Sequence, residues 1–167
     1  MKQRIFNRGA ITVVIAIVIF SLFSIQALAA STTTAQRNAI ANDWTFYAQG
    51  TETYNCLAYA LGNTTSWVWP WGASNPTFSQ VQTYLNGKGY AESYKVGFIG
   101  PIQPCKITCY GTTSAITHFA KYTNTSNNTG WTGQVRAKWG ACEIFTHSTP
   151  NPYVPTGIYG KQVAVFR

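Results

Sequence analysis

An apolar run near the N-terminus limits which part of this chain can fold as a globular domain. Three positive residues precede the run, the run spans residues 10–25, and an Ala-Leu-Ala sequence ends at Ala29. A positive segment, an apolar segment and a small-residue cleavage site in this order are typical of a secretory signal peptide. We therefore predict that residues 1–29 are a signal peptide, cleaved after Ala29.

The alternative interpretation is an uncleaved membrane anchor. The run of 16 residues is shorter than the ~20 apolar residues that a membrane span requires. We therefore expect no membrane span after cleavage, and a location outside the cell or at the cell envelope. The 138 residues that remain have the usual size of one domain with one hydrophobic core, so residues 30–167 are predicted to form a single domain.

The charge of the mature chain narrows the classes of partner. Three of the 12 Lys and Arg residues lie in the predicted signal peptide, which leaves 9 positive against 4 acidic side chains and a net charge of +5. The positive residues are scattered singly, whereas nucleic-acid-binding proteins show a basic stripe or cluster. The excess positive charge suits an anionic surface such as a bacterial envelope, or serves solubility alone. We predict a monomer without a nucleic-acid partner.

Residue patterns predict helices first and strands later. Capping residues indicate three helices, and apolar residues at helical spacing support the second and third: residues 35–41, 56–61 and 77–87. Short β-type runs between turn residues indicate five strands: residues 93–99, 106–110, 116–123, 133–139 and 162–166. The polar segment 123–130 is typical of a hairpin loop. This order of elements predicts an α+β domain.

Cys56 stands at the start of the predicted helix 56–61. A thiolate at a helix N-terminus is stabilised by unpaired backbone N–H groups and by the helix dipole, which lowers its pKa and makes it nucleophilic. A nucleophile of this kind needs a base, and the chain has two histidines, His118 and His147. His118 lies on a predicted strand face, where a core histidine without a catalytic role would look the same. His147 precedes loop residues, as a surface histidine does.

The four cysteines leave the state of Cys56 open, because exported chains usually pair their cysteines. Cys105 and Cys109 lie ~13 Å apart along an extended segment, too far to bond each other. If Cys56 is the nucleophile, one bridge forms among the remaining three. We predict Cys105–Cys142, with Cys109–Cys142 as the alternative. A two-bridge arrangement that consumes Cys56 is the structural alternative to catalysis.

Several segments, in order, resemble the motifs of a group of uncharacterised bacterial domains related to papain-like peptidases of the NlpC and CHAP type. They are Asn-Cys-x-Ala-x-Ala-x-Gly at residues 55–62, Trp-Pro at 69–70, Thr-His-x-Ala at 117–120, Lys-x-Gly at 138–140, an acidic-Ile and His motif at 143–147, and the ending at 159–167. The sequence departs from the family pattern at Ala137, where the family has serine, and by one extra residue before His147.

The resemblance implies a papain-like fold, in which a catalytic helix packs on an antiparallel sheet. It implies an exported cysteine hydrolase that cleaves an amide or ester bond in a peptide or peptidoglycan substrate, with Cys56 as nucleophile and His118 as base. The third catalytic residue is then His147, with Gln134 in reserve. We expect substrate contacts from four further residues: Asn55, Trp67, Trp69 and Lys138.

Other functions remain open at this stage. The tryptophans at 67, 69 and 71 either line a cleft or clamp a loop by packing. A non-catalytic binding module of the same fold would use the aromatic loop 66–72 as its contact surface, and a toxin-type effector is a third reading. We predict no cofactor and no metal, since the histidines and the four acidic residues show no ligand spacing. Glycosidase chemistry, which needs a carboxylate pair, has no positive support.

Overall fold

The computed structural model describes residues 31–93, 104–123 and 133–167. The predicted signal peptide, nearly all of the predicted strand 93–99 and nearly all of the predicted loop 123–130 lie outside the described residues.

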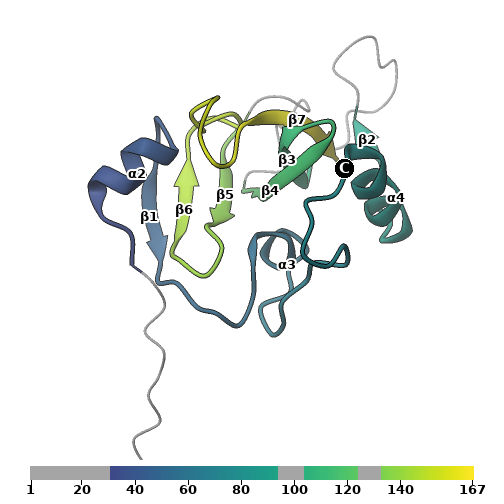
Figure 1. Cartoon of the computed structure of the whole chain (residues 1–167), viewed down its shortest axis with the longest axis horizontal. Helices are drawn as coiled ribbons and strands as arrows, with labels where there is room; N and C mark the ends of the chain where they lie inside the picture. The colour runs from purple at the N-terminus through teal and green to yellow at the C-terminus, as the bar shows by residue number, and fades with distance from the viewer. Residues whose placement is uncertain (1–30, 94–103, 124–132) are drawn as a thin grey trace, which may run out of the picture.

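An antiparallel sheet forms the centre of the described chain (Figure 1). Within the described ranges it has seven strands in the order β1-β6-β5-β4-β3-β7-β2. In chain order the strands are β1 (Thr45–Ala48), β2 (Glu92–Ser93), β3 (Ile107–Thr112), β4 (Ala115–Tyr122), β5 (Val135–Lys138), β6 (Ile144–His147) and β7 (Lys161–Phe166). The predicted α+β class and the antiparallel sheet are confirmed.

Three helices, each beginning at a capping side chain, accompany the sheet in the described part of the chain. They are α2 (Thr34–Ile40), α3 (Cys56–Ala60) and α4 (Phe78–Gly87), which agree with the predicted helices to within one or two residues. Thr33 and Thr77 form capping boxes with a glutamine three residues later. Asn55 caps α3 by accepting a hydrogen bond from the Ala58 N–H at 3.0 Å.

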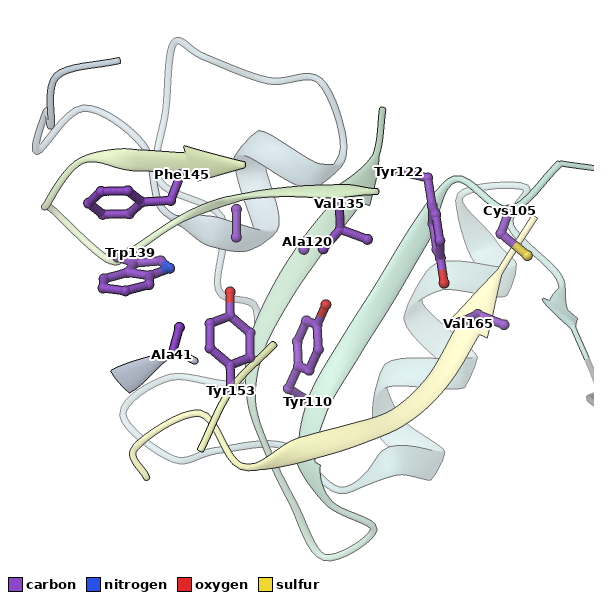
Figure 2. Close-up of a cluster of buried hydrophobic side chains, with 11 residues drawn as sticks. Ala41, Cys105, Tyr110, Ala120, Tyr122, Val135, Trp139, Phe145, Tyr153 and Val165 are labelled. Carbon is purple, nitrogen blue, oxygen red and sulfur yellow. The ribbon is translucent and has the colours of Figure 1, made fainter. Parts of the chain in front are cut away.

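The sheet separates two clusters of buried side chains. One face packs against α3 and α4 around Leu57, Leu85 and Phe119. The other face packs against the end of α2 and the segment after β6, around Tyr110, Trp139 and Tyr153. Figure 2 shows this second cluster, with the rings of Tyr110 and Tyr153 side by side and their centroids 4.7 Å apart.

A β-bulge in β4 places His118. Tyr110 pairs with His118, but the next residue of β3, Gly111, pairs with Ile116, so Thr117 is extra. The extra residue lets Ile116 join the helix-side cluster while His118 contacts Tyr153 of the opposite cluster. Gly111 is required there, because it has φ 128° and an added Cβ would lie 2.2 Å from the Ala115 carbonyl oxygen.

No helix in the described ranges is both long and apolar enough to cross a membrane.

Candidate active site

Cys56 and His118 line the same cavity, of about 340 Å³. α3 carries Cys56 at its first position and packs against β4, which carries His118. β5 pairs with β4 only at Lys121 and Tyr122, so the part of β4 around His118 has no β5 neighbour. The remaining lining comes from other segments: Asn55, Trp67, Trp69, Gly72, Ala73, Thr117, Gly140 and Tyr159. The structure therefore brings the predicted nucleophile and base to one cavity.

The thiol of Cys56 is neutral at rest. Burial raises its pKa to about 11, although hydrogen bonds from the backbone of Phe119, Leu57 and Cys56 itself act in the opposite direction. The sequence-based expectation of a lowered pKa is corrected, because α3 has only five residues and Cys56 is 6% exposed. At this site desolvation raises the thiol pKa by more than the N-terminus of the short helix lowers it. The Phe119 N–H, next in sequence to His118, is among the groups that hydrogen-bond the sulfur.

Tyr153 links the two histidines. Its hydroxyl lies 3.0 Å from Nε2 of His118 and 3.4 Å from Nε2 of His147. Nδ1 of His147 hydrogen-bonds the backbone carbonyl of Asp43. His147 thus reaches His118 only through Tyr153, and it does so from a buried position rather than from the surface. The third residue next to the base is therefore a tyrosine, with the predicted His147 behind it.

One set of proton positions satisfies every contact in this chain of hydrogen bonds. A carbonyl only accepts, so His147 carries its proton on Nδ1 and accepts at Nε2. Burial raises the pKa of Tyr153 well above its usual value, so its hydroxyl keeps its proton and donates it to His147. Tyr153 then accepts from Nε2–H of His118. Nδ1 of His118 is left with a lone pair, and it is buried without a hydrogen-bond partner in the described chain.

Burial also keeps both imidazoles neutral. The pKa of His118 lies well below its ordinary value, because burial opposes the charged form and His147 adds a like charge. Burial lowers the pKa of His147 as well. The hydrogen bond to the Asp43 carbonyl and the charge of the Asp43 carboxylate raise it, but burial outweighs them. Tyr159 stacks on the His118 ring with centroids 3.8 Å apart. Thr117 holds Tyr159 by donating to its carbonyl oxygen at 2.9 Å.

Asn55 lines the cavity, but its side chain is used internally. Besides capping α3, it donates to the Val68 carbonyl at 2.8 Å and accepts from the Val68 N–H at 3.4 Å. The side chain therefore ties the aromatic loop to the start of α3. The structure gives Asn55 a positioning role here, and substrate contact by this residue stays a prediction.

Trp67 and Trp69 both line the cavity, while Trp69 and Trp71 also pack within the aromatic loop. Trp69 packs edge-on against Trp71 and Phe119 and donates to the Ser74 carbonyl at 3.2 Å. Trp67 lines the cavity with 53% of its surface exposed. Both readings of the cluster thus hold in part, because Trp69 and Trp71 clamp the loop while Trp67 presents its ring to solvent.

Lys138 and Gln134 do not line the cavity. Lys138 is buried, and its ammonium donates to the Gly140 and Cys142 carbonyls in the turn between β5 and β6. Burial lowers its pKa to about 8. Lys138 thus holds Gly140 at the cavity, and its charge acts on Cys56 by lowering the pKa of the thiol. Substrate contact by Lys138 stays a prediction. Gln134 is exposed and accepts from the Thr123 hydroxyl at 3.2 Å, so it does not serve as the third residue.

The predicted Cys105–Cys142 bridge and its Cys109–Cys142 alternative are corrected, because all four cysteines are thiols in the structure. Cys105 lies beside Val165 and Tyr122, at one end of the cluster in Figure 2, and Trp139 lies at the other end. Cys142 lies three residues after Trp139, and its backbone N–H donates to the Trp139 carbonyl at 2.8 Å. A bridge requires Cβ atoms within ~4.5 Å, which opposite ends of a sheet do not offer.

No group of three His, Cys, Asp or Glu side chains in the described ranges could hold a metal ion. The residues that sequence reasoning missed are Tyr153, Tyr159 and Asp43. Tyr153 gave one signal, its position between Pro152 and Pro155, which indicates a rigid loop. Asp43 acts through its backbone carbonyl, which no side-chain pattern can reveal.

Comparison with protein families places residues 45–167 in a family described as a domain of unknown function (DUF7689). The match covers more than half of the chain, so the protein belongs to this family. Comparison with curated proteins gave no match. Comparison with solved structures gave none either.

Proposed function

We propose that this protein is an exported cysteine hydrolase of papain-like architecture that cleaves an amide or ester bond, possible substrates being peptides or peptidoglycan of the cell wall. The observation that carries the proposal is that Nδ1 of His118 is buried without a hydrogen-bond partner in the described chain, while His118 shares a cavity with Cys56. A buried, unsatisfied nitrogen is costly and calls for an explanation, and a catalytic base supplies one.

Three features of the fold support the papain-like assignment. A cysteine begins a helix, the helix packs on an antiparallel sheet, and the histidine lies on the strand that the helix contacts. The hydrogen-bonded group behind the base is Tyr153 rather than an amide or acid, but it performs the same task of orienting the imidazole.

The mechanism follows from the proton positions. As the Cys56 sulfur attacks the acyl carbon, Nδ1 of His118 takes the thiol proton and a C–S bond forms. The carbonyl oxygen becomes an oxyanion, which backbone N–H groups beside the sulfur stabilise. His118 then protonates the leaving amine or alcohol, and a thioester remains. Water attacks the thioester while Nδ1 of His118 takes its proton. The C–S bond breaks, His118 returns the proton to the sulfur of Cys56, and the acid product leaves.

The thiol proton of Cys56 moves to His118 during the attack on the acyl carbon and not in the resting enzyme. The pKa of the thiol is about 11 and that of His118 lies well below its ordinary value, so a preformed thiolate–imidazolium pair is unfavourable. His118 therefore acts as a general base during bond formation.

Hydrolysis assays with the chain from residue 30 onward test this function. Ester, amide and peptidoglycan-fragment substrates are compared for the unmodified protein, Cys56→Ala, His118→Gln and the matched thiol control Cys142→Ala. We expect Cys56→Ala and His118→Gln to lower kcat/KM at least about a hundredfold, and Cys142→Ala to leave it unchanged. Turnover that survives in Cys56→Ala would contradict the proposal.

A second candidate is a non-catalytic binding module, which the exposed ring of Trp67 favours. Its indole stands at the cavity with 53% of its surface exposed, and aromatic faces of this kind stack on sugars and other ring systems. Sedimentation with cell-wall material separates the two functions. Binding that is lost in Trp67→Ala, kept in the exposed aromatic control Phe46→Ala and unaccompanied by turnover would favour the module.

A further inference from the structure

Residues 31–43, the N-terminal strap, precede the family match at 45–167 but bind both ends of strand β6. α2, which forms most of the strap, buries none of its residues. Apolar burial by the helix therefore does not explain why the strap is held in place. Polar contacts at the two ends of the strap explain it, and the contacts at one end involve residues of the candidate site.

The first anchor is Glu143, which directly precedes β6 and is 1% exposed. Its carboxylate accepts from the Ser31 hydroxyl at 3.0 Å and from the Thr32 N–H and hydroxyl at 3.1 and 2.9 Å. The guanidinium of Arg37 adds an ion pair at 2.8 Å. Burial alone would raise the pKa of Glu143, but these hydrogen bonds together with its own backbone N–H lower it overall. The carboxylate is therefore charged and fully engaged by the strap.

The second anchor is Asp43, at the other end of β6. Its carboxylate accepts from the Ser148 hydroxyl at 2.6 Å and from the Ser148 N–H. Its backbone carbonyl accepts from Nδ1 of His147. The carboxylate thus holds in place the carbonyl that decides which nitrogen of His147 carries the proton.

The strap also binds the backbone on both sides of Tyr153. The Asn42 N–H donates to the Pro152 carbonyl at 2.9 Å, and the Val154 N–H donates to the Ile40 carbonyl at 3.0 Å. Ala41 forms an isolated antiparallel bridge with Tyr153 itself. The same short piece of the strap therefore holds both residues behind the base: it binds the side chain of His147 and the backbone on either side of Tyr153.

We propose that the N-terminal strap is a positioning element for the base His118. The Asp43 carbonyl fixes the proton of His147 on Nδ1, His147 takes the Tyr153 proton, and Tyr153 holds the His118 proton on Nε2, which leaves Nδ1 of His118 bare. This inference rests on the proposed function for its catalytic meaning. The tautomers themselves rest on the hydrogen bonds and on a protonated Tyr153, not on catalysis.

Nitrogen-15 NMR of the imidazoles in the full mature chain measures this directly. The unmodified protein must show the Nδ1–H tautomer for His147 and the Nε2–H tautomer for His118. Asp43→Ala, which frees the carbonyl from Ser148, and Glu143→Gln, which weakens the distant anchor, must each give mixed tautomers. Glu52→Gln, an exposed acid outside the strap, is the matched control and must leave both tautomers unchanged.

Labelling of Cys56 by a small alkylating reagent, resolved by peptide mapping, gives a second readout with Cys142 as internal reference. We expect Asp43→Ala to slow Cys56 labelling about tenfold, the range of a typical coupling between linked groups. The opposite tautomers in the unmodified chain would overturn the proposal without any variant. Unchanged tautomers and labelling in a folded Glu143→Gln or Asp43→Ala protein would also overturn it. Predicted tautomers with an inert Cys56 would instead contradict the proposed function.

Discussion

At the scale of single residues, Tyr153 connects the groups that determine the chemistry of the site. Its hydroxyl bridges two buried histidines, and its ring packs edge-on against Tyr110. A phenol is suited to this place because it donates to one imidazole and accepts from the other while staying uncharged. The site therefore holds its base by neutral groups, which a buried environment tolerates better than a carboxylate.

Tyr153→Phe removes this bridge and keeps the ring. We expect kcat/KM to fall about tenfold to a hundredfold, because His118 loses the partner that sets its tautomer. The free energy of unfolding should fall by about 1–3 kcal/mol, since Nε2–H of His118 stays buried and unsatisfied. Kinetics and urea titration of Tyr153→Phe are compared with Tyr110→Phe, whose hydroxyl donates to the Pro150 carbonyl at 2.9 Å instead. An equal loss of activity in both variants would assign Tyr153 to stability alone.

The lowered pKa values of His118 and His147 predict that acid destabilises the fold. Above pH 6.5, the ordinary histidine value, folded and unfolded chains both hold neutral imidazoles. Below it the unfolded chain binds protons that the folded chain excludes, so stability falls as pH decreases, by up to about 1.4 kcal/mol per pH unit for each histidine. Urea unfolding at pH 7.5 and 5.5 measures this loss. His118→Gln should reduce this loss of stability by about half. An unchanged loss would contradict its attribution to the buried histidines.

At the scale of elements, the short helix α3 depends on its first turn. Asn55 both caps the helix and binds the backbone of Val68, so one side chain fixes the nucleophile's helix and the aromatic loop together. α3 has five residues, all buried, and a helix this short is held by packing and by its cap.

Asn55→Ala should therefore cost about 1–3 kcal/mol of folding stability, because it removes the cap and leaves buried partners on Val68 unpaired. The loop should loosen as well, and the fluorescence of Trp67 and Trp69 should change. Asn63→Ala is the matched control, because Asn63 makes only local bonds in an exposed turn. Similar losses in the two variants would show that Asn55 has no special role.

Elements with strong local signals were predictable from the sequence, and short strands without such signals were not. The three helices of the described residues all carry caps, and four of the predicted strands overlap β3, β4, β5 and β7. The strands β1 and β6, which have four residues each, were not predicted. Three of the four β1 residues are exposed, so no alternation marks it. β6 lies inside a motif that was interpreted for its histidine alone.

At the scale of the whole molecule, the candidate site draws on segments far apart in sequence. The Cys56 and His118 pair was predictable, because the chain offers two histidines and one cysteine at a helix start. Tyr153 was not, since it joins His118 across 35 positions by way of a loop. The pKa of Cys56 was predicted in the wrong direction, because burial in the assembled cavity decides it.

The two thiols of the helix-side cluster should therefore differ in reactivity. Cys56 and Cys109 both belong to this cluster, but only Cys56 lines the cavity. Cys109 is fully buried, and burial raises its pKa to about 12. In the native protein we expect Cys109 to label at least about a thousandfold more slowly, through global unfolding alone. Mass spectrometry after alkylation at increasing urea would record this, and equal rates in the absence of urea would contradict the fold of the cavity.

The most direct measurement of the central claim is the intact mass of the protein during turnover of a slowly hydrolysed ester. The account predicts an acyl adduct on Cys56 that forms and decays in the unmodified chain, is absent in Cys56→Ala, and forms much more slowly in His118→Gln. An adduct on another thiol, or one that forms at the same rate without His118, would contradict it.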